Sequence, residues 1–219
     1  MQTPLLDLIE KKHVSKSTLS DFNVLYYHPK IGLAGETGAS WESNIKKYSE
    51  ERIIFPVFDH HNFFKGFAYR TPSFKSFYDD GINISQALYG LSVNYSNIQK
   101  KNYAVLVEGL FDCLKLYNDG IDNVLSGFGT NLTWDQMCLL TRICKFVFIC
   151  YDPDDAGRSA AIKTAEILRK GDIMSVIVDL KDKDPDEFID CYGRQTFIEL
   201  CDSSLILQNS LRNEINQRI

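Results

Sequence analysis

Three aspartates follow a short apolar run in the segment FVFICYDPDDAGRSAA, residues 146–161. Asp152, Asp154 and Asp155 lie within four positions, and small residues then open a segment with helical spacing. Carboxylates crowded at one strand end repel each other unless a cation lies among them. Mg²⁺ keeps several waters and takes one or two carboxylates plus phosphate oxygens, which suits two aspartates two residues apart on a turn. The segment therefore predicts a divalent-metal site that acts on phosphate groups.

The elements that must position these acids alternate between strand and helix from residue 103 onward. Helical segments are expected between the strands, and Thr133 followed by Gln136 has the spacing of a capping box. Apolar strands separated by helices predict an α/β fold whose largely parallel sheet is covered on both faces. The four strands are expected within residues 103–109, 122–129, 145–152 and 173–180.

Further acids follow other strands of the same expected sheet. Glu108 ends the first strand, and Asp184 and Asp186 follow the fourth. In parallel sheets the chemistry lies beyond the carboxyl ends of the strands, so these side chains are expected to converge with Asp152 and Asp154. Taken singly, each acid has a structural alternative, such as capping a helix or pairing with a lysine. For Asp155, helix capping is the expected role.

The first hundred residues have a different texture and predict a smaller α+β region. Residues 7–22 have helical spacing, and residues 52–70 indicate a β-hairpin around a polar turn. Residues 77–102 are interpreted as loop-like. The expected organisation is an N-terminal subdomain at 1–100, an α/β domain at 101–190 and a helical tail at 191–219.

Composition indicates an ordinary globular protein of 219 residues with 44% hydrophobic content. No stretch approaches the roughly 18 apolar residues of a membrane helix, and the start lacks the pattern of a signal peptide, so a cytoplasmic protein is expected. The six cysteines form no C-x-x-C pair and are expected to be buried thiols without zinc. The net charge of −5 excludes a surface that is basic throughout, although basic residues gather in the first third of the chain.

Four motifs in order, VEGLFD, LSGFGTNLTWDQ, CYDPDDAGRSAA and KDPDEF, resemble the successive motifs of a Toprim domain, in the version found in bacterial-type DNA primases of the DnaG family. A bare D-x-D pattern is common by chance, whereas this ordered set is specific. The helical segment before residue 30, the hairpin and the LYGL motif at 88–91 extend the resemblance to roughly residues 5–190. The hairpin in particular separates primases from other Toprim proteins.

The resemblance implies a primase catalytic core, a nucleotidyltransferase that makes short RNA primers from ribonucleoside triphosphates on a single-stranded DNA template during DNA replication. It implies Mg²⁺ or Mn²⁺ as cofactor, with Glu108 alternatively the proton acceptor. The implied metal centre is Glu108, Asp152 and Asp154, with Asp112, Asp184 and Asp186 as further acidic positions. Arg52, Arg70 and Lys75 occupy family positions that bind template and nucleotide phosphates.

The sequence also departs from the family pattern. No zinc-type spacing of cysteine and histidine precedes the core, so a separate zinc-binding module and a replicative helicase are expected partners, and a phage or mobile element is one natural source for such a short core. Two alternatives remain open: a Toprim nuclease that uses Glu108 as base, and a non-catalytic scaffold that binds single-stranded DNA. The hairpin argues against the nuclease, and the complete acidic set argues against the scaffold, because uncompensated acids cost stability.

Overall fold

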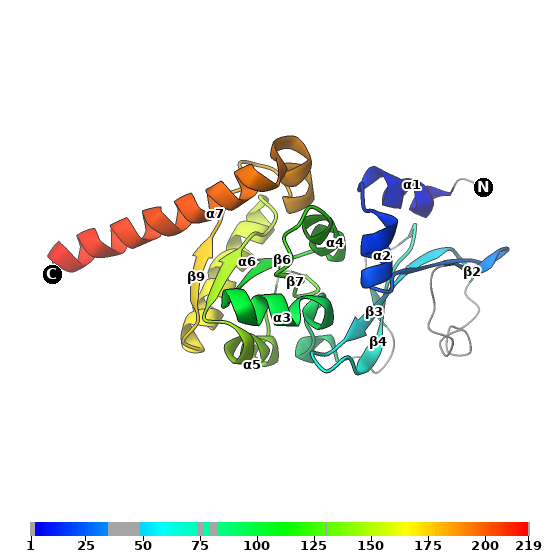
Figure 1. Ribbon diagram of the computed structural model, residues 1–219, viewed down its shortest axis with the longest axis horizontal. Helices are drawn as coiled ribbons and strands as arrows, with labels where there is room; N and C mark the ends of the chain where they lie inside the picture. Colours follow the sequence, from blue (N-terminus) through cyan, green and yellow to red (C-terminus); the bar gives the residue numbers. More distant parts are fainter. Residues whose placement is uncertain (1–2, 35–48, 74–76, 79–82, 130, 219) are drawn as a thin grey trace.

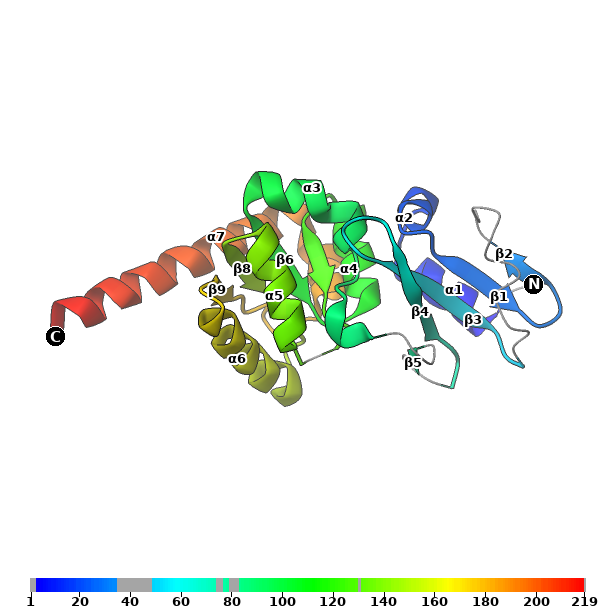
Figure 2. The same ribbon diagram turned by 90° about the horizontal axis from the view of Figure 1, so that it is seen from below.

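The computed structural model describes residues 3–34, 49–73, 77–78, 83–129 and 131–218. The described residues form two sheets that lie side by side, with a long C-terminal helix extending away from both (Figures 1 and 2). One sheet has five antiparallel strands in the order β2-β1-β3-β4-β5, and the other has four parallel strands in the order β7-β6-β8-β9. This arrangement confirms the predicted α/β fold with a preceding α+β region.

Two short helices precede the antiparallel sheet. Helix α1 (Pro4–Lys11) begins after Thr3, and helix α2 (Lys16–Asp21) begins after Ser15, whose hydroxyl oxygen accepts the backbone N–H of Thr18. Residues 7–22, whose spacing predicted helix, therefore belong to two helices, because the N-cap side chain of Ser15 starts a new one. The hairpin expected at 52–70 is confirmed as strands β3 and β4. The strands are β1 (Leu25–His28), β2 (Gly32–Ala34), β3 (Arg52–Phe58), β4 (Phe64–Arg70) and β5 (Phe77–Tyr78).

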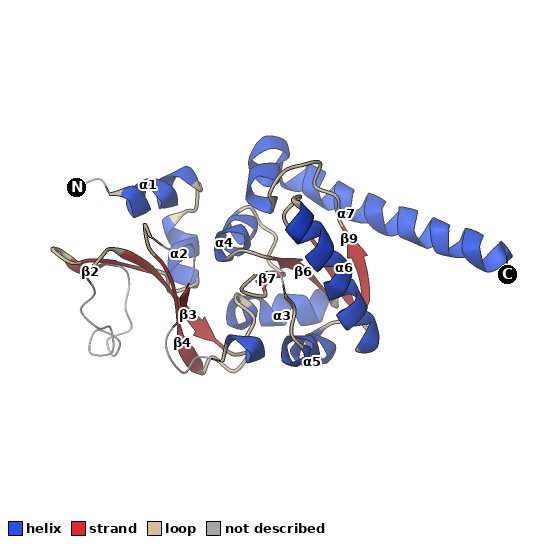
Figure 3. Cartoon of the chain, turned by 180° about the vertical axis from the view of Figure 1, so that it is seen from behind, coloured by secondary structure: helices blue, strands red, loops and turns tan. Residues whose placement is uncertain are grey.

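The parallel sheet follows the predicted order of elements. Its strands β6 (Tyr103–Val107), β7 (Val124–Ser126), β8 (Phe146–Ile149) and β9 (Met174–Ile177) all run in the same direction. The expected capping box of Thr133 and Gln136 is present, and helices cover the sheet (Figure 3). The helices that follow the first three strands are α4 (Leu110–Asn118), α5 (Trp134–Ile143) and α6 (Asp155–Lys170).

The two faces of the parallel sheet pack into different parts of the core. Val105 and Phe148 pack with side chains of α4 and the C-terminal helix, and their cluster continues into the antiparallel sheet through Phe55. Leu106 and Val147 pack on the other side with α5 and α6. The first of these clusters contains residues of both sheets, so hydrophobic burial holds the two sheets together.

Residues 77–102 differ from the expected loop, because helix α3 (Leu91–Lys101) and a 3₁₀ turn, η1 (Ile84–Gln86), lie within them. The buried face of α3 consists of Leu91, Asn94 and Ile98, so a polar residue occupies its centre. The Asn94 side chain donates a hydrogen bond to the carbonyl of Val124 at 2.7 Å, which satisfies it inside the core. A buried polar residue at the centre of the packed face hides the helical periodicity.

Helix α7 (Pro185–Arg218) continues the chain after β9 and is interrupted by Gly193, whose φ is +78°. Phe188 and Phe197 are buried on either side of this kink and join the core. The helix runs across the expected tail boundary at residue 190, while the domain limits themselves stay a prediction. Of the six cysteines four are buried free thiols, whereas Cys191 is exposed and Cys138 is half-buried. Within the described residues, no helix is long and apolar enough to span a membrane.

Candidate active site

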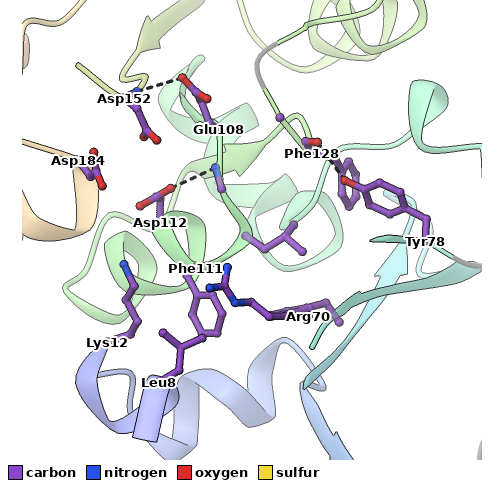
Figure 4. A pocket seen from close by; sticks show the side chains of 14 residues that line it. Leu8, Lys12, Arg70, Tyr78, Glu108, Phe111, Asp112, Phe128, Asp152 and Asp184 are labelled. Atoms are coloured by element: carbon purple, nitrogen blue, oxygen red, sulfur yellow. Dashed lines mark hydrogen bonds between the residues drawn. The ribbon is translucent and has the colours of Figure 1, made fainter. Parts of the chain in front are cut away.

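A cavity of about 420 Å³ lies between the carboxyl edge of the parallel sheet and the antiparallel sheet (Figure 4). Carboxylates come to it from the parallel sheet, while a lysine that follows α1 and an arginine of β4 come from the N-terminal side. Its lining residues are Leu8, Lys12, Phe55, Arg70, Tyr78, Glu108, Gly109, Leu110, Phe111, Asp112, Phe128, Gly129, Asp152 and Asp184.

Four of the six predicted acids line this cavity. Glu108 follows β6, Asp152 follows β8, Asp184 follows β9, and Asp112 lies in the first turn of α4. The Glu108 Oε1 accepts the backbone N–H of Asp152 at 3.1 Å, and the Asp112 Oδ2 accepts that of Gly109 at 3.1 Å. The convergence expected from the strand order is therefore present for Glu108, Asp152 and Asp184, whereas Asp154 and Asp186 do not line the cavity.

Burial and mutual repulsion make these carboxyls hard to ionise. Burial raises the pKa of Glu108 to about 7, and the nearby charges of Asp154, Asp112 and Asp184 add to the shift. Burial likewise raises the pKa of Asp152 to about 7, followed by the charges of Asp112 and Glu108. The pKa of Asp112 rises to about 6 through burial, although Lys12 opposes that rise. A cation placed among these groups would favour their ionised forms.

One atom of the site fits such a cation directly. The Asp152 Oδ1 is buried and accepts no hydrogen bond from any described residue. A buried carboxylate oxygen without a donor is costly unless a metal ligates it. Within the described part of the chain, no three Asp, Glu, His or Cys side chains already form a metal-binding group. The acids therefore surround the cavity in suitable number and chemistry, and ligation requires their side chains to turn toward a common point.

Asp154, and not Asp155, caps the helix that follows β8. Asp154 is the N-cap of α6, and its Oδ1 accepts the N–H of Gly157 at 2.7 Å. Asp155, the expected cap, is the first helical residue, is exposed, and pairs with Arg158 at 3.0 Å. The capping expectation for Asp155 is therefore wrong by one position, because Asp154 is the residue with the extended backbone of a cap, with φ −75° and ψ 171°. Asp154 is not among the residues lining the cavity, although its charge contributes to the raised pKa of Glu108.

Asp186 is not among the residues that line the cavity. It is buried, pairs with Lys12 at the C-terminal end of α1, and its Oδ1 accepts the backbone N–H of Glu187 at 2.9 Å. The structure therefore uses Asp186 to tie the parallel-sheet region to the N-terminal region. Lys12 is a cavity residue that the sequence reasoning missed, because one of two adjacent lysines at a helix end carries no local signal of its distant partner.

Close approach of α6 to the acids depends on Gly157. A Cβ at this position would overlap the carbonyl oxygen of Asp152 and lie 2.7 Å from the Glu108 Oε1. Glycine therefore lets the N-terminus of the helix sit directly against the two acid-bearing turns. The positive end of the helix macrodipole therefore lies beside Glu108 and the turn at Asp152.

The three predicted basic residues have different outcomes. Arg70 lines the cavity, and burial lowers the pKa of its guanidinium from its ordinary value. Arg70 lies opposite Ile53 of β3, so their side chains share one face of the sheet. Arg52 precedes Ile53 in β3 and pairs with Tyr27, so its side chain projects from the other face. The Arg52 guanidinium lies over the Tyr69 ring, 5.4 Å from its centroid, on the face away from the cavity. Lys75 lies outside the described residues.

The sequence and fold of the chain resemble those of known proteins. Residues 105–189 match the Toprim-like protein family. The chain is 35% identical over 184 residues to the DNA primase of Clostridium acetobutylicum, a match that covers 78% of this chain and 30% of that primase. The zinc-binding and RNA polymerase domains of the Aquifex aeolicus primase superpose with a TM-score of 0.80 at 24% identity, covering 99% of this chain and 60% of the other.

A second solved structure, the DnaG primase catalytic domain bound to single-stranded DNA, gives a TM-score of 0.69 at 23% identity and covers 97% of this chain and 78% of that chain. The chain spans about a third of the length of the curated primase that it matches. At these identities the solved structures establish the fold, and the primase sequence match establishes the kind of Toprim domain. The chain thus carries a Toprim domain of the DnaG primase type, within the fold of a DnaG catalytic core.

Proposed function

We propose that this chain is a primase catalytic core, a nucleotidyltransferase that joins ribonucleoside triphosphates into a short RNA primer on single-stranded DNA. The observation that carries the proposal is the single cavity in which Glu108, Asp112, Asp152 and Asp184 face Arg70. Nucleotidyl transfer needs little covalent help from the protein, and depends on positioning and charge neutralisation at phosphate groups. A cavity with acids on one side and cations on the other supplies both.

The proposed cofactor is Mg²⁺ or Mn²⁺. Divalent cations, when bound, activate the attacking 3′-hydroxyl and stabilise the charge of the leaving pyrophosphate. Glu108 and Asp152 are the proposed principal ligands, with Asp112 and Asp184 beside them and Asp154 contributing the oxygen that does not cap α6. The raised pKa of Glu108, about 7, also suits a proton acceptor near neutral pH.

The cations have complementary proposed roles. Arg70 and Lys12 line the cavity and would hold the phosphates of the nucleotide. Arg52, which lies outside the cavity, and Lys75 are proposed contacts to the template backbone. Asp186 is proposed to act indirectly, through its pair with Lys12. A zinc-binding module, which the Aquifex structure contains, and a replicative helicase are proposed partners.

The test is RNA synthesis on single-stranded DNA with labelled ribonucleotides and Mg²⁺ or Mn²⁺. Asp152→Asn removes one ligand charge without changing side-chain volume, and is expected to reduce the product at least about 100-fold. Asp155→Asn is the matched control, since Asp155 belongs to the same motif but is exposed and pairs with Arg158. Extension of an annealed RNA primer, assayed in parallel, bypasses any need for a separate initiation module.

Each alternative function has its own result in this assay. Metal-dependent cutting of the template that is lost in Asp152→Asn would favour the nuclease. Binding of single-stranded DNA without synthesis, extension or cutting would favour the scaffold. Equal activity of the chain and of Asp152→Asn would contradict the proposed metal centre.

A further inference from the structure

The end of the cavity opposite the carboxylates is built from two aromatic side chains. Figure 4 shows the Tyr78 and Phe128 rings on one side of the cavity and the acids on the other. The ring centroids are 5.9 Å apart and the rings are nearly perpendicular, at 84°. Both residues are half-buried and line a cavity whose other side chains are partly charged and partly apolar. Neither has a role in the proposed metal chemistry.

Hydrogen bonds connect this aromatic pair to the acidic side of the cavity. The Tyr78 hydroxyl donates to the carbonyl of Phe128 at 3.1 Å, and the Phe128 N–H donates to the Ser126 Oγ at 3.2 Å. The Ser126 hydroxyl in turn donates to the carbonyl of Glu108 at 2.7 Å. Ser126 is completely buried, which fixes its position. The rings are therefore held at a set position relative to the backbone of the acid that follows β6.

The backbone at Phe128 is in a conformation that a phenylalanine rarely adopts. Its φ is +64°, in the left-handed region that favours glycine, and Gly129 follows with φ +136°. Such strain persists only where surrounding structure enforces it, and it gathers at functional sites. A glycine would fit this backbone more easily, so the presence of phenylalanine points to a use for the ring. Behind it the buried Tyr89 ring packs at 6.2 Å between centroids.

The cavity offers groups suited to each part of a nucleotide. Carboxylates suited to metal ions lie at one end, the aromatic rings lie at the other, and the Arg70 side chain enters from the side of β4, beside Phe111 (Figure 4). A nucleoside triphosphate carries metal-bound phosphates at one end and its base at the other, and a cavity of about 420 Å³ is of ligand size. Aromatic rings stack on any of the four bases, as a site requires when the template selects the nucleotide.

We propose that Tyr78 and Phe128 form the wall that contacts the base of the bound ribonucleoside triphosphate. This inference rests on the proposed function, because it assigns a nucleotide to the same cavity. The rings contribute binding that is independent of base identity, while the acids and Arg70 hold the triphosphate end. Tyr78 also fixes Phe128 through the hydrogen bond to its carbonyl.

The decisive measurement compares a ligand that has a base with one that lacks it. ATP and inorganic tripolyphosphate, each with Mg²⁺, are titrated against the chain and against Phe128→Ala and Tyr78→Ala. Both variants are expected to lower the affinity for ATP roughly tenfold, the scale of one lost base-stacking contact, and to leave the affinity for tripolyphosphate unchanged. In primer extension, the KM for ribonucleotides is expected to rise by a similar factor, with kcat within about twofold.

Two further variants control for loss of structure. Phe63→Ala removes a ring that is 66% exposed on the β3–β4 turn, outside the cavity, and is expected to change neither ligand's affinity. Phe128→Leu keeps most of the side-chain volume but lacks the aromatic face, so it tests stacking if the alanine variant does not fold. Melting curves establish that each variant is folded before its affinities are compared.

Several outcomes would overturn the inference. Equal weakening of ATP and tripolyphosphate would make the rings a structural support, and a change in single-stranded DNA affinity alone would assign them to the template. Magnesium-dependent ATP binding that needs Asp152 but ignores both rings would remove this inference and leave the proposed function standing. Absence of ATP binding by the unaltered chain would remove both.

Discussion

The two sheets of this chain distribute charged side chains by different rules. In the parallel sheet every strand ends at the same edge, so Glu108, Asp152 and Asp184 meet there through topology alone. In the antiparallel sheet, Arg52 and Arg70 lie at the same end of one hairpin but on opposite faces, because side chains alternate along a strand. Convergence in a parallel sheet follows from strand order, whereas convergence in an antiparallel sheet depends on the parity of each position.

The difference also explains how the acidic edge is stabilised. The described residues of the parallel-sheet region bring acids together without supplying a cation to the cavity, and the pKa values of Glu108 and Asp152 rise to about 7. The cavity's cationic side chains, Lys12 and Arg70, come from the N-terminal region. The cavity therefore lies between acidic side chains of one region and cationic side chains of the other, and each set can be substituted separately.

The largest effect is expected at the helix that closes the acidic edge. Gly157→Ala places a methyl group against the carbonyl of Asp152 and the carboxylate of Glu108, so α6 must shift away from both. Overpacking of this kind costs roughly 1–3 kcal/mol, and displacement of the two acids is expected to reduce synthesis at least about 100-fold. Urea unfolding and primer extension measure the two effects. Ser159→Ala, at an exposed position of the same helix, is the control.

Retention of full activity by Gly157→Ala would mean that the acids tolerate movement of α6. In that case the close approach of the helix would be a packing feature without a role in positioning the site.

The second prediction separates the two faces of the antiparallel sheet. Arg70→Ala removes a cation that lines the cavity and is expected to weaken nucleotide binding about tenfold. Arg52→Ala removes a guanidinium that covers the Tyr69 ring on the other face. This variant is expected to leave nucleotide affinity unchanged and to weaken the binding of single-stranded DNA. Titration with tripolyphosphate and with labelled DNA distinguishes them. Equal losses of nucleotide affinity would show that strand parity does not decide which arginine reaches the substrate.

The same contrast explains what the sequence could and could not predict. The four parallel strands were predictable because each is a short apolar run between helical segments, and Glu108, Asp152 and Asp184 were predictable because they follow three of those runs. Asp186 met the same criterion, yet a lysine 174 residues away in the sequence draws it into an ion pair. Strand-end position predicts where an acid lies but not which partner it finds.

Other features depended on details that a single sequence does not display. The N-cap of α6 is Asp154 and not Asp155, because the backbone becomes helical one residue earlier than the small-residue pattern indicated. Arg52 and Arg70 looked equivalent, and only the strand register assigned them to different faces. The helix α3 was missed because the buried Asn94 interrupts its apolar face.

The third prediction concerns the ion pair that joins the two regions. Lys12→Met leaves the buried carboxylate of Asp186 without its cation and is expected to lower the free energy of unfolding by about 2 kcal/mol. The value lies below that of a fully buried pair because Lys12 is partly exposed. Lys65→Met breaks an exposed pair with Asp59 and is expected to cost under about 1 kcal/mol. Urea unfolding of both variants, with Asp186→Asn in a double-mutant cycle, measures the coupling; a coupling near zero would contradict the proposed tether.

The smallest expected effect is a pH dependence of stability that arises at the acidic edge. The pKa of Asp152 is about 7 in the fold against an ordinary value of 3.8, so between these values the folded state binds more protons than the unfolded state. Stability from this group is therefore highest below about pH 4, falls as pH rises, and is fully lost above about pH 7. Asp152→Asn has no such group to ionise. At pH 8 without metal, the variant is expected to melt roughly 3 °C higher than the unaltered chain, the shift that about 1 kcal/mol gives at this chain length.

Added Mg²⁺ sharpens this last prediction, because a cation favours the ionised carboxylates that cause the loss. Melting curves from pH 5 to pH 8, with Mg²⁺ and with chelator, are expected to converge for Asp152→Asn and to separate for the unaltered chain as pH rises. The antiparallel region provides the internal control, since Lys65→Met is expected to keep the pH slope of the unaltered chain. Identical slopes for the chain and for Asp152→Asn would mean that the acidic edge is already neutralised from the N-terminal side, by Lys12 and Arg70, without any need for metal.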